Sequence, residues 1–394
     1  MAPLIFGSIA FLHNYTDSTI KRPGDSSVQK QSPETRLNAI CPYYTMYPLD
    51  FPLNILRKAK PGEWVLDPFC GRGTTNFAAR LCGLPSVGID INPVATAIAS
   101  AKMVRVHPDE IINLCEKIIN NTDDPIELPS GEFWELCYHR ETLREIAKIR
   151  EYLLKNAQQP AEIALRAIML GILHGPKNKR LPSYLSNQMP RTYATKPNSA
   201  INYWKKKSMK PERVSTLEVV RRKAEYFYGK TPEFAHGIIL TKDSRTIESG
   251  SIPNKFKWVI TSPPYFGMRT YVPDQWLRYW FLGGSSDVTY SIKGQIQHYS
   301  VEQFTKELAK VWSRIAEFCE SGAKMVIRFG ALPSRALDSK KLISKSISLA
   351  NAGWKIKTIR SAGSSLKGYR QALQFGSVSQ VALEEYDIYV ILEA

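Results

Sequence analysis

The pattern of apolar and polar positions predicts an α/β fold that begins with two strand–helix units. Residues 64–66 form a short apolar strand, a glycine-rich turn follows at 70–73, and residues 74–82 have helical spacing. A second apolar strand covers residues 86–90, and Asn92, directly before a proline, starts the next helix. This alternation is the opening of a doubly wound, mostly parallel sheet.

A long helical insertion interrupts the predicted sheet after its second strand. Helical spacing alone recurs over residues 108–121, 138–156, 161–175 and 215–229. Strands and helices then alternate again, with strands expected at 236–244, 257–262, 323–330, 354–361 and 386–394. We therefore divide the chain into an N-terminal segment with a linker (1–40), a sheet domain (41–104 and 235–394) and an insertion (105–234).

The charge of the chain points to an anionic partner. The formal net charge of the 394 residues is +17, and the pI is about 9.5. Between His174 and Lys230 the insertion carries 14 Lys or Arg against 3 Glu. An excess of this kind favours a polyanion, with nucleic acid as the first choice. A basic protein without a charged partner is the alternative.

Cysteine spacing and hydropathy argue against a zinc protein, a membrane protein and a secreted protein. The six cysteines include no C-x-x-C pair and no Cys/His cluster with zinc spacing, so we expect reduced thiols and no metal. No apolar run approaches the length of a membrane span. The apolar residues 3–13 lack a preceding basic residue, which makes them a poor signal peptide. We expect a cytoplasmic protein.

The first candidate site is DPFCGRGTT, residues 67–75. Asp67 stands at the carboxyl end of a strand, and Gly71 and Gly73 let the backbone approach a ligand closely. Thr74 or Thr75 is a candidate cap for the following helix. The sequence is not G-x-x-x-x-G-K-[ST], which excludes a phosphate-binding P-loop. An ordinary strand–turn–helix corner is the alternative.

Two further strand ends carry polar residues that suit a nucleoside cofactor. Asp90, about twenty residues after the glycine turn, stands where such sheets bind ribose hydroxyls, with Asn92 beside it. Asp243 and Ser244 follow the third strand and are candidates to bind an adenine edge. The alternatives are a helix cap at Asp90 and Asn92 and a plain turn at Asp243.

The stretch TSPPY, residues 261–265, ends a core strand with two prolines and an aromatic ring. At this point the chain resembles the S-adenosylmethionine-dependent DNA amino-methyltransferases of bacterial restriction–modification systems. Their catalytic motif, [DNS]-P-P-[YFW], corresponds here to Ser262, Pro263, Pro264 and Tyr265. The resemblance implies a Rossmann-like methyltransferase fold, with residues 41–104 and 235–394 as its catalytic domain.

The resemblance also assigns the cofactor, S-adenosylmethionine, to residues of four motifs. They are Tyr47 and Phe51 in YPLDFPLNIL, Asp67, Phe69, Gly71, Gly73 and Thr74 in the glycine motif, Asp90 and Asn92 at the ribose, and Asp243 and Ser244 at the adenine.

The serine–proline corner suits the chemistry of amine methylation. An exocyclic amine is a poor nucleophile because its lone pair is delocalised into the ring. Hydrogen-bond acceptors at Ser262 and at the Pro263 carbonyl would bind the two N–H groups and draw the nitrogen toward a tetrahedral geometry, so that its lone pair points at the methyl group. Tyr265 would stack on a base flipped out of the duplex. In the family, Ser at the first motif position leans toward cytosine N4, and Asp toward adenine N6. We expect cytosine N4, with adenine N6, an RNA amino-methyltransferase and a catalytically silent nucleic-acid-binding protein as alternatives.

The basic insertion is the candidate target-recognition region. Its cations suit phosphates, and its amides and Arg191 have the forked groups that read base edges. The candidates for DNA binding are Lys177, Lys179, Arg180, Asn187, Gln188, Arg191, Lys205, Lys206 and Lys207, with Arg269 after the catalytic corner. Arg269 and Tyr271 are candidates for the base pocket, whereas Trp276 and Trp280 are expected in the core. The expected partners are duplex DNA and a cognate restriction endonuclease.

Overall fold

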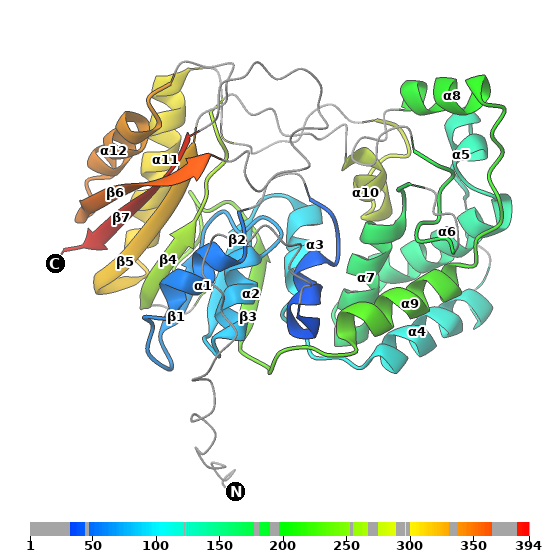
Figure 1. Ribbon diagram of the computed structural model, residues 1–394, viewed down its shortest axis with the longest axis horizontal. Coiled ribbons are helices and arrows are strands. Elements are labelled where there is room, and N and C mark those ends of the chain that lie inside the picture. The colour runs from blue at the N-terminus through cyan, green and yellow to red at the C-terminus, as the bar shows by residue number, and fades with distance from the viewer. Residues whose placement is uncertain are drawn as a thin grey trace, which may run out of the picture. The chain divides into compact units, whose positions relative to one another are not determined.

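A seven-stranded sheet with the strand order β3-β2-β1-β4-β5-β7-β6 forms the centre of the fold in the computed structural model (Figure 1). The strands are β1 (Trp64–Asp67), β2 (Ser86–Asp90), β3 (Gly237–Thr241), β4 (Phe256–Thr261), β5 (Cys319–Gly330), β6 (Trp354–Ser364) and β7 (Glu384–Leu392). Neighbours from β3 to β5 are parallel, and β7 is inserted antiparallel between β5 and β6. The predicted α/β fold with a mostly parallel sheet is confirmed.

The structure describes residues 32–43, 47–121, 123, 125, 127–176, 181–189, 197–252, 255–266, 275–288, 296, 300–330, 337–364 and 384–393. Residues Pro33–Ala394 form one compact unit, to which all that follows refers.

Helices cover the two faces of the sheet unequally. On one face, α11 (Val301–Ala316) and α12 (Ser339–Ala350) pack on the apolar side of β5 and β7, around Met325, Ile327, Ile388 and Val390. On the other face, α1 (Asp50–Leu56) and α2 (Thr74–Leu81) pack on β1 and β4, around Val65, Trp258 and Ile260. This second face is open over β6, where Lys357 and Arg360 are exposed.

The insertion follows α3 (Pro93–Ala101) and consists of helices, as predicted. They are α4 (Pro108–Asn121), α5 (Glu132–Cys137), α6 (Arg140–Lys155), α7 (Pro160–Ile172), α8 (Pro197–Lys206) and α9 (Thr216–Tyr228). Their apolar faces share one core with α3, with the 3₁₀ helix Pro33–Ala39 and with α10 (Trp276–Phe281). Trp276 and Trp280 are 2% and 4% exposed within this core, which confirms their predicted packing role. The domain boundary at residues 104 and 235 stays a prediction.

Candidate active site at the carboxyl ends of β1 and β4

The serine–proline corner directly follows β4, and β4 lies beside β1, which leads into the glycine turn. Two side chains tie these strand ends together. Thr261 donates its hydroxyl hydrogen to Asp67 Oδ1 at 2.7 Å, and Thr75 donates to the Ile260 carbonyl at 3.1 Å. Because parallel strands end at the same edge, these bonds place Ser262 next to the turn at residues 70–73.

Asp67 is the centre of this junction. Its side chain is fully buried and accepts hydrogen bonds from the Phe69 amide at 3.1 Å and the Tyr47 hydroxyl at 3.0 Å, besides that from Thr261. Burial raises the pKa of this carboxyl to about 6, although the hydrogen bonds work in the opposite direction. Asp67 and Tyr47 therefore hold the strand ends and the segment before α1 in place, and their contact with a cofactor stays a prediction.

The two glycines of the turn are required for different structural reasons. Gly73 has φ = +75°, and a Cβ atom there would stand 2.7 Å from the Cβ of Ala99 on α3, so close packing requires this glycine. Gly71 has φ = +50°, and a Cβ atom there would meet nothing within 4 Å in the described chain. The backbone at Gly71 therefore borders free space at the sheet edge, as a ligand that approaches the turn would need.

The predicted threonine cap of α2 is wrong. The N-cap is Gly73 in the left-handed conformation, and no side chain caps the helix. Thr74 is the first residue of the helix, and Thr75 instead bonds to β4 and to Tyr47. An N-cap side chain must stand on the non-helical residue before the first turn, and the glycine occupies that position.

Asp90, the predicted acceptor for the ribose, lies directly beside the glycine turn. Its carboxylate accepts from the Gly71 amide at 2.9 Å and the Asn92 amide at 2.8 Å, and a carboxylate can accept about four hydrogen bonds in all. Burial raises the pKa of this carboxyl. The Ile91 amide also favours the charged carboxylate, and the acceptor capacity that remains beside the free space at Gly71 is compatible with a ribose hydroxyl, a contact that stays a prediction.

Asn92 is the N-cap of α3, as the alternative interpretation proposed. Its Oδ1 accepts from the Val94 amide at 2.9 Å, and its amide group donates to the Tyr43 hydroxyl at 2.9 Å. Tyr43 and Tyr279 lie close enough to Asp90 for its charge to raise the pKa of both hydroxyls, although burial is the larger cause. Neither tyrosine belongs to a sequence motif, so the sequence offered no signal for them.

The two residues predicted to bind the adenine, Asp243 and Ser244, make hydrogen bonds within the chain itself. Asp243 accepts from Arg245 at 2.9 Å, and Arg245 also pairs with Glu307. Burial alone would raise the pKa of Asp243, but the bonds from Arg245 hold it below its usual value. Ser244 is 5% exposed and donates its hydroxyl hydrogen to the Pro68 carbonyl at 2.6 Å, which fixes the start of the glycine motif.

The ring of Tyr265 is held by two residues that the sequence did not indicate. Its hydroxyl donates to Glu385 Oε1 at 2.6 Å, and the ring meets Phe329 edge to face with centroids 5.3 Å apart. Glu385 is 7% exposed and lies opposite Gly330 in the β5–β7 register. Phe51, a predicted cofactor residue, is buried under the guanidinium of Arg328, 3.8 Å from its ring centroid, and Phe69 packs edge to face on Trp312.

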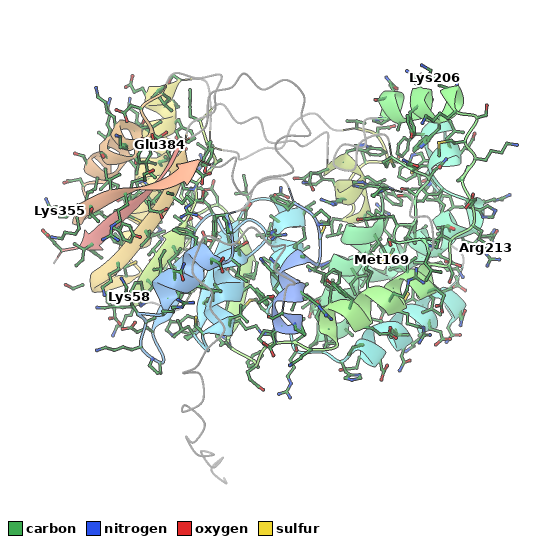
Figure 2. All side chains as sticks on the ribbon, viewed as in Figure 1. Lys58, Met169, Lys206, Arg213, Lys355 and Glu384 are labelled. Carbon is green, nitrogen blue, oxygen red and sulfur yellow. The ribbon has the colours of Figure 1, made fainter. Side chains whose placement is uncertain are left out.

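The candidate DNA contacts divide into three groups. Lys177, Lys179, Arg180, Arg191, Arg269 and Tyr271 lie outside the described residues. Asn187 is 6% exposed, donates to the Leu136 carbonyl at 3.1 Å and accepts from the Gln188 amide at 2.8 Å, so its side chain does not fit a base-reading role. At the end of α8, Lys205 pairs with Glu132 and Lys206 is exposed (Figure 2). Lys207, just beyond the helix, lies over the ring of Tyr203.

The described residues offer neither a metal site nor a membrane span. Within these ranges no group of three or more His, Cys, Asp or Glu side chains could hold a metal ion. No helix in the described part of the chain is long and apolar enough to cross a membrane.

A family model described as DNA methylase matches residues 18–101, which include the glycine motif and Asp90. Curated relatives match over short stretches. Ribosomal protein L11 methyltransferases from Burkholderia vietnamiensis and Burkholderia ambifaria are 40% and 38% identical over 75 and 78 residues. These stretches are 19% and 20% of this chain, and the chain spans 22% and 23% of the length of these relatives.

Solved structures align with most of the chain at low similarity. TrmN from Thermus thermophilus has a TM-score of 0.35 and 10% identity, with 91% of this chain and 52% of that chain covered. The rRNA methyltransferase aviRa from Streptomyces viridochromogenes has a TM-score of 0.33 and 11% identity, with 90% and 92% covered. The strand order and the DNA methylase match support a methyltransferase with S-adenosylmethionine as its cofactor.

Proposed function

We propose that the chain transfers a methyl group to an exocyclic amine of a base in duplex DNA, with cytosine N4 as the target. The observation that supports this most is the position of Ser262, Pro263, Pro264 and Tyr265, directly after β4 and bonded through Thr261 to the strand end that carries the glycine motif. A pair of hydrogen-bond acceptors and an aromatic ring thus stand beside the predicted methionine end of the cofactor.

The residues of the corner have separate tasks in this proposal. Ser262 Oγ and the Pro263 carbonyl accept hydrogen bonds from the two N–H groups of the amine, which directs the nitrogen lone pair away from conjugation with the ring. The prolines keep the carbonyl fixed, because their φ angle is restricted. Tyr265 stacks on the flipped base, and Glu385 holds the Tyr265 hydroxyl. When bound, S-adenosylmethionine supplies an electrophilic methyl group, so the corner needs no strong base.

The choice of substrate rests on the motif and on charge. The match to a DNA methylase model and the net charge of +17 favour nucleic acid. The serine at position 262 favours cytosine N4 over adenine N6, and a role in restriction–modification or phage defence would follow. The L11 methyltransferases, which match over a short stretch, make ribosomal protein a competing substrate, and an RNA amine is the other alternative.

Mapping of modified bases in DNA from cells that express the chain tests this proposal. We expect N4-methylcytosine at one recurring short sequence with the wild-type chain and none with Ser262→Ala. N6-methyladenine at a recurring site would overturn the cytosine assignment alone. Methylation confined to ribosomal protein or RNA in the same cells would overturn the DNA substrate.

A further inference from the structure

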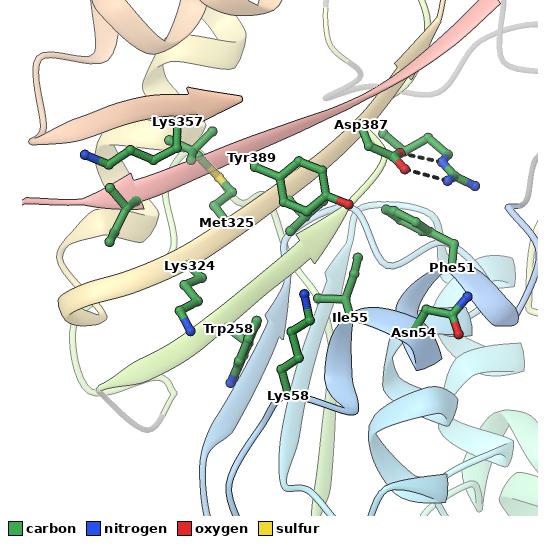
Figure 3. Close-up of a pocket in the computed structure, with 14 residues that line it drawn as sticks. Phe51, Asn54, Ile55, Lys58, Trp258, Lys324, Met325, Lys357, Asp387 and Tyr389 are labelled. Atoms are coloured by element: carbon green, nitrogen blue, oxygen red, sulfur yellow. Dashed lines mark hydrogen bonds and ion pairs between the residues drawn. The ribbon is translucent and has the colours of Figure 1, made fainter. Parts of the chain in front are cut away.

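A groove of about 560 Å³ lies on the open face of the sheet, and Phe51 is the residue of its lining that is also a predicted cofactor residue (Figure 3). Residues from α1, β4, β5, β7 and β6 line it. Its lining includes four cations, Lys58, Lys324, Arg328 and Lys357, and a single carboxylate, Asp387. The ring of Tyr389 lies among them in Figure 3.

The strand register explains why so many cations share this face. Lys324 and Arg328 on β5 stand opposite Ile391 and Asp387 on β7, and directly opposed residues project to the same side. On β6, Arg360 stands opposite Asp387 and adds another exposed cation to this side. Every second residue of β5 and β7 projects to the other side, where Met325, Ile327, Ile388 and Val390 belong to the core under α11 and α12.

The one carboxylate in the lining does not neutralise the groove. Asp387 accepts two parallel bonds from Arg328, each of 2.8 Å, so this pair is internally balanced. Lys357 pairs with Glu393 at 2.9 Å. Lys58 and Lys324 are exposed, and neither has a carboxylate partner among the described residues; Lys324 Nζ lies 4.7 Å from the ring centroid of Trp258.

Protection of a sheet edge does not account for this arrangement. Lysines on an edge strand discourage pairing with other chains, and Lys357 on β6 serves that purpose. However, Lys324 stands on β5, which has a partner strand on each side, and Lys58 stands just beyond the end of α1. Their charges converge on one groove without any edge to protect, so a ligand with negative charge explains them better.

The strands that line the groove run on toward the candidate active site. Along β7, Glu385 is on the same side as Asp387 and Tyr389, and it binds the Tyr265 hydroxyl. From Lys324 to Gly330, which borders Tyr265, β5 extends about 20 Å. One DNA strand carries about six phosphates over this length.

We propose that this groove binds the phosphate backbone of duplex DNA that flanks the target base. This inference rests on the proposed DNA substrate and adds a second contact surface to the basic insertion. Lys58, Lys324 and Lys357 contact phosphates, and the aromatic and aliphatic floor packs against the sugars. Contacts of this kind strengthen binding and fix the orientation of the duplex without reading its sequence.

Substitution of three lysines by glutamine tests the groove. The test protein carries Lys58→Gln, Lys324→Gln and Lys357→Gln. The control carries Lys306→Gln, Lys341→Gln and Lys345→Gln, on the helices that cover the other face, where Lys306 is paired with Glu302 as Lys357 is with Glu393. Binding of duplexes of about 12 and about 30 base pairs is measured by fluorescence anisotropy against salt concentration, together with methyl transfer.

We expect the test protein to bind the long duplex at least tenfold more weakly than the control, with a salt slope lower by roughly 0.9 for each lost phosphate contact. Both proteins should bind the short duplex alike and keep the wild-type rate of methyl transfer to it. Equal binding of the long duplex by both proteins would overturn the groove and leave the proposed function intact. Absence of DNA binding and transfer in the wild-type chain would overturn the proposed function, and the groove with it.

Discussion

At the scale of single residues, the orientation of Tyr265 depends on a partner that lies 120 residues away in the sequence. The motif shows that an aromatic ring stands at the corner, but the sequence does not show what holds it. Glu385 meets Tyr265 only because β7 is inserted antiparallel beside β5. Local patterns indicate the motif, and the strand order decides its neighbours.

Substitution of Glu385 separates positioning from packing. Glu385→Gln keeps an acceptor for the Tyr265 hydroxyl, so we expect kcat within a few-fold of wild type. Glu385→Ala removes it, and loss of a hydrogen bond to a charged group should lower kcat/KM for DNA roughly 10- to 100-fold, with the Kd for the cofactor unchanged. Steady-state kinetics measure this. Glu384→Ala is the control, because Glu384 accepts from the exposed Tyr386 hydroxyl on the same strand. Equal kinetics for Glu385→Ala and Glu384→Ala would contradict the role.

Asp67 makes stability depend on pH in a direction opposite to that of most carboxylates. Its pKa in the folded chain is about 6, against about 3.9 in an unfolded chain, so the folded state binds more protons between these values. The free energy of unfolding should therefore fall as the pH rises from about 4 to about 6. The whole titration is worth about 3 kcal/mol, since each pKa unit corresponds to about 1.4 kcal/mol, and about 2 kcal/mol of it falls between pH 4 and pH 6.

Comparison with Asp67→Asn isolates this effect, because the other titrating groups are common to both proteins. Urea unfolding at several pH values should show that the wild-type chain loses about 2 kcal/mol relative to the variant between pH 4 and pH 6. A difference that does not change with pH would contradict the raised pKa.

At the scale of elements, the glycine turn shows how one motif serves two purposes. Gly73 lets α2 and α3 approach each other, and Gly71 borders the free space beside Asp90. The spacing G-x-G predicted a close approach of the backbone to a ligand. It could not distinguish the glycine that a helix requires from the glycine that faces a ligand, because that difference arises from the packing of α3.

The packing role of Gly73 predicts a large cost for Gly73→Ala. A left-handed φ alone costs an alanine about 1 kcal/mol, and the contact with Ala99 should add roughly 1–3 kcal/mol. Gly83→Ala is the matched control, because Gly83 has φ = +68° and free space around it. Chemical denaturation measures both. Equal destabilisation of the two variants would contradict the close contact between α2 and α3.

At the scale of the whole molecule, the sequence predicted the strands along the chain, the helical insertion and its position after the second strand, but not the order of the strands in the sheet. It missed α5 and α8, short helices within polar stretches that a few buried side chains such as Trp204 hold in the core. It also assigned base reading to Asn187, whose side chain is turned inward. Polarity predicts exposure poorly where a buried amide can bond to backbone groups.

The central claim is that the serine–proline corner activates an exocyclic amine of DNA. The most direct measurement is transfer of a labelled methyl group from S-adenosylmethionine to duplex DNA by the purified wild-type chain and by Ser262→Ala, with cofactor binding determined by calorimetry. Ser348→Ala, at an exposed serine of α12, is the control. We predict label at cytosine N4 with the wild-type chain. In Ser262→Ala the rate of methyl transfer should fall by about 100-fold or more, the usual effect of losing one hydrogen bond that stabilises a transition state, with an unchanged cofactor Kd. Transfer by Ser262→Ala within a few-fold of the wild-type rate would contradict the claim.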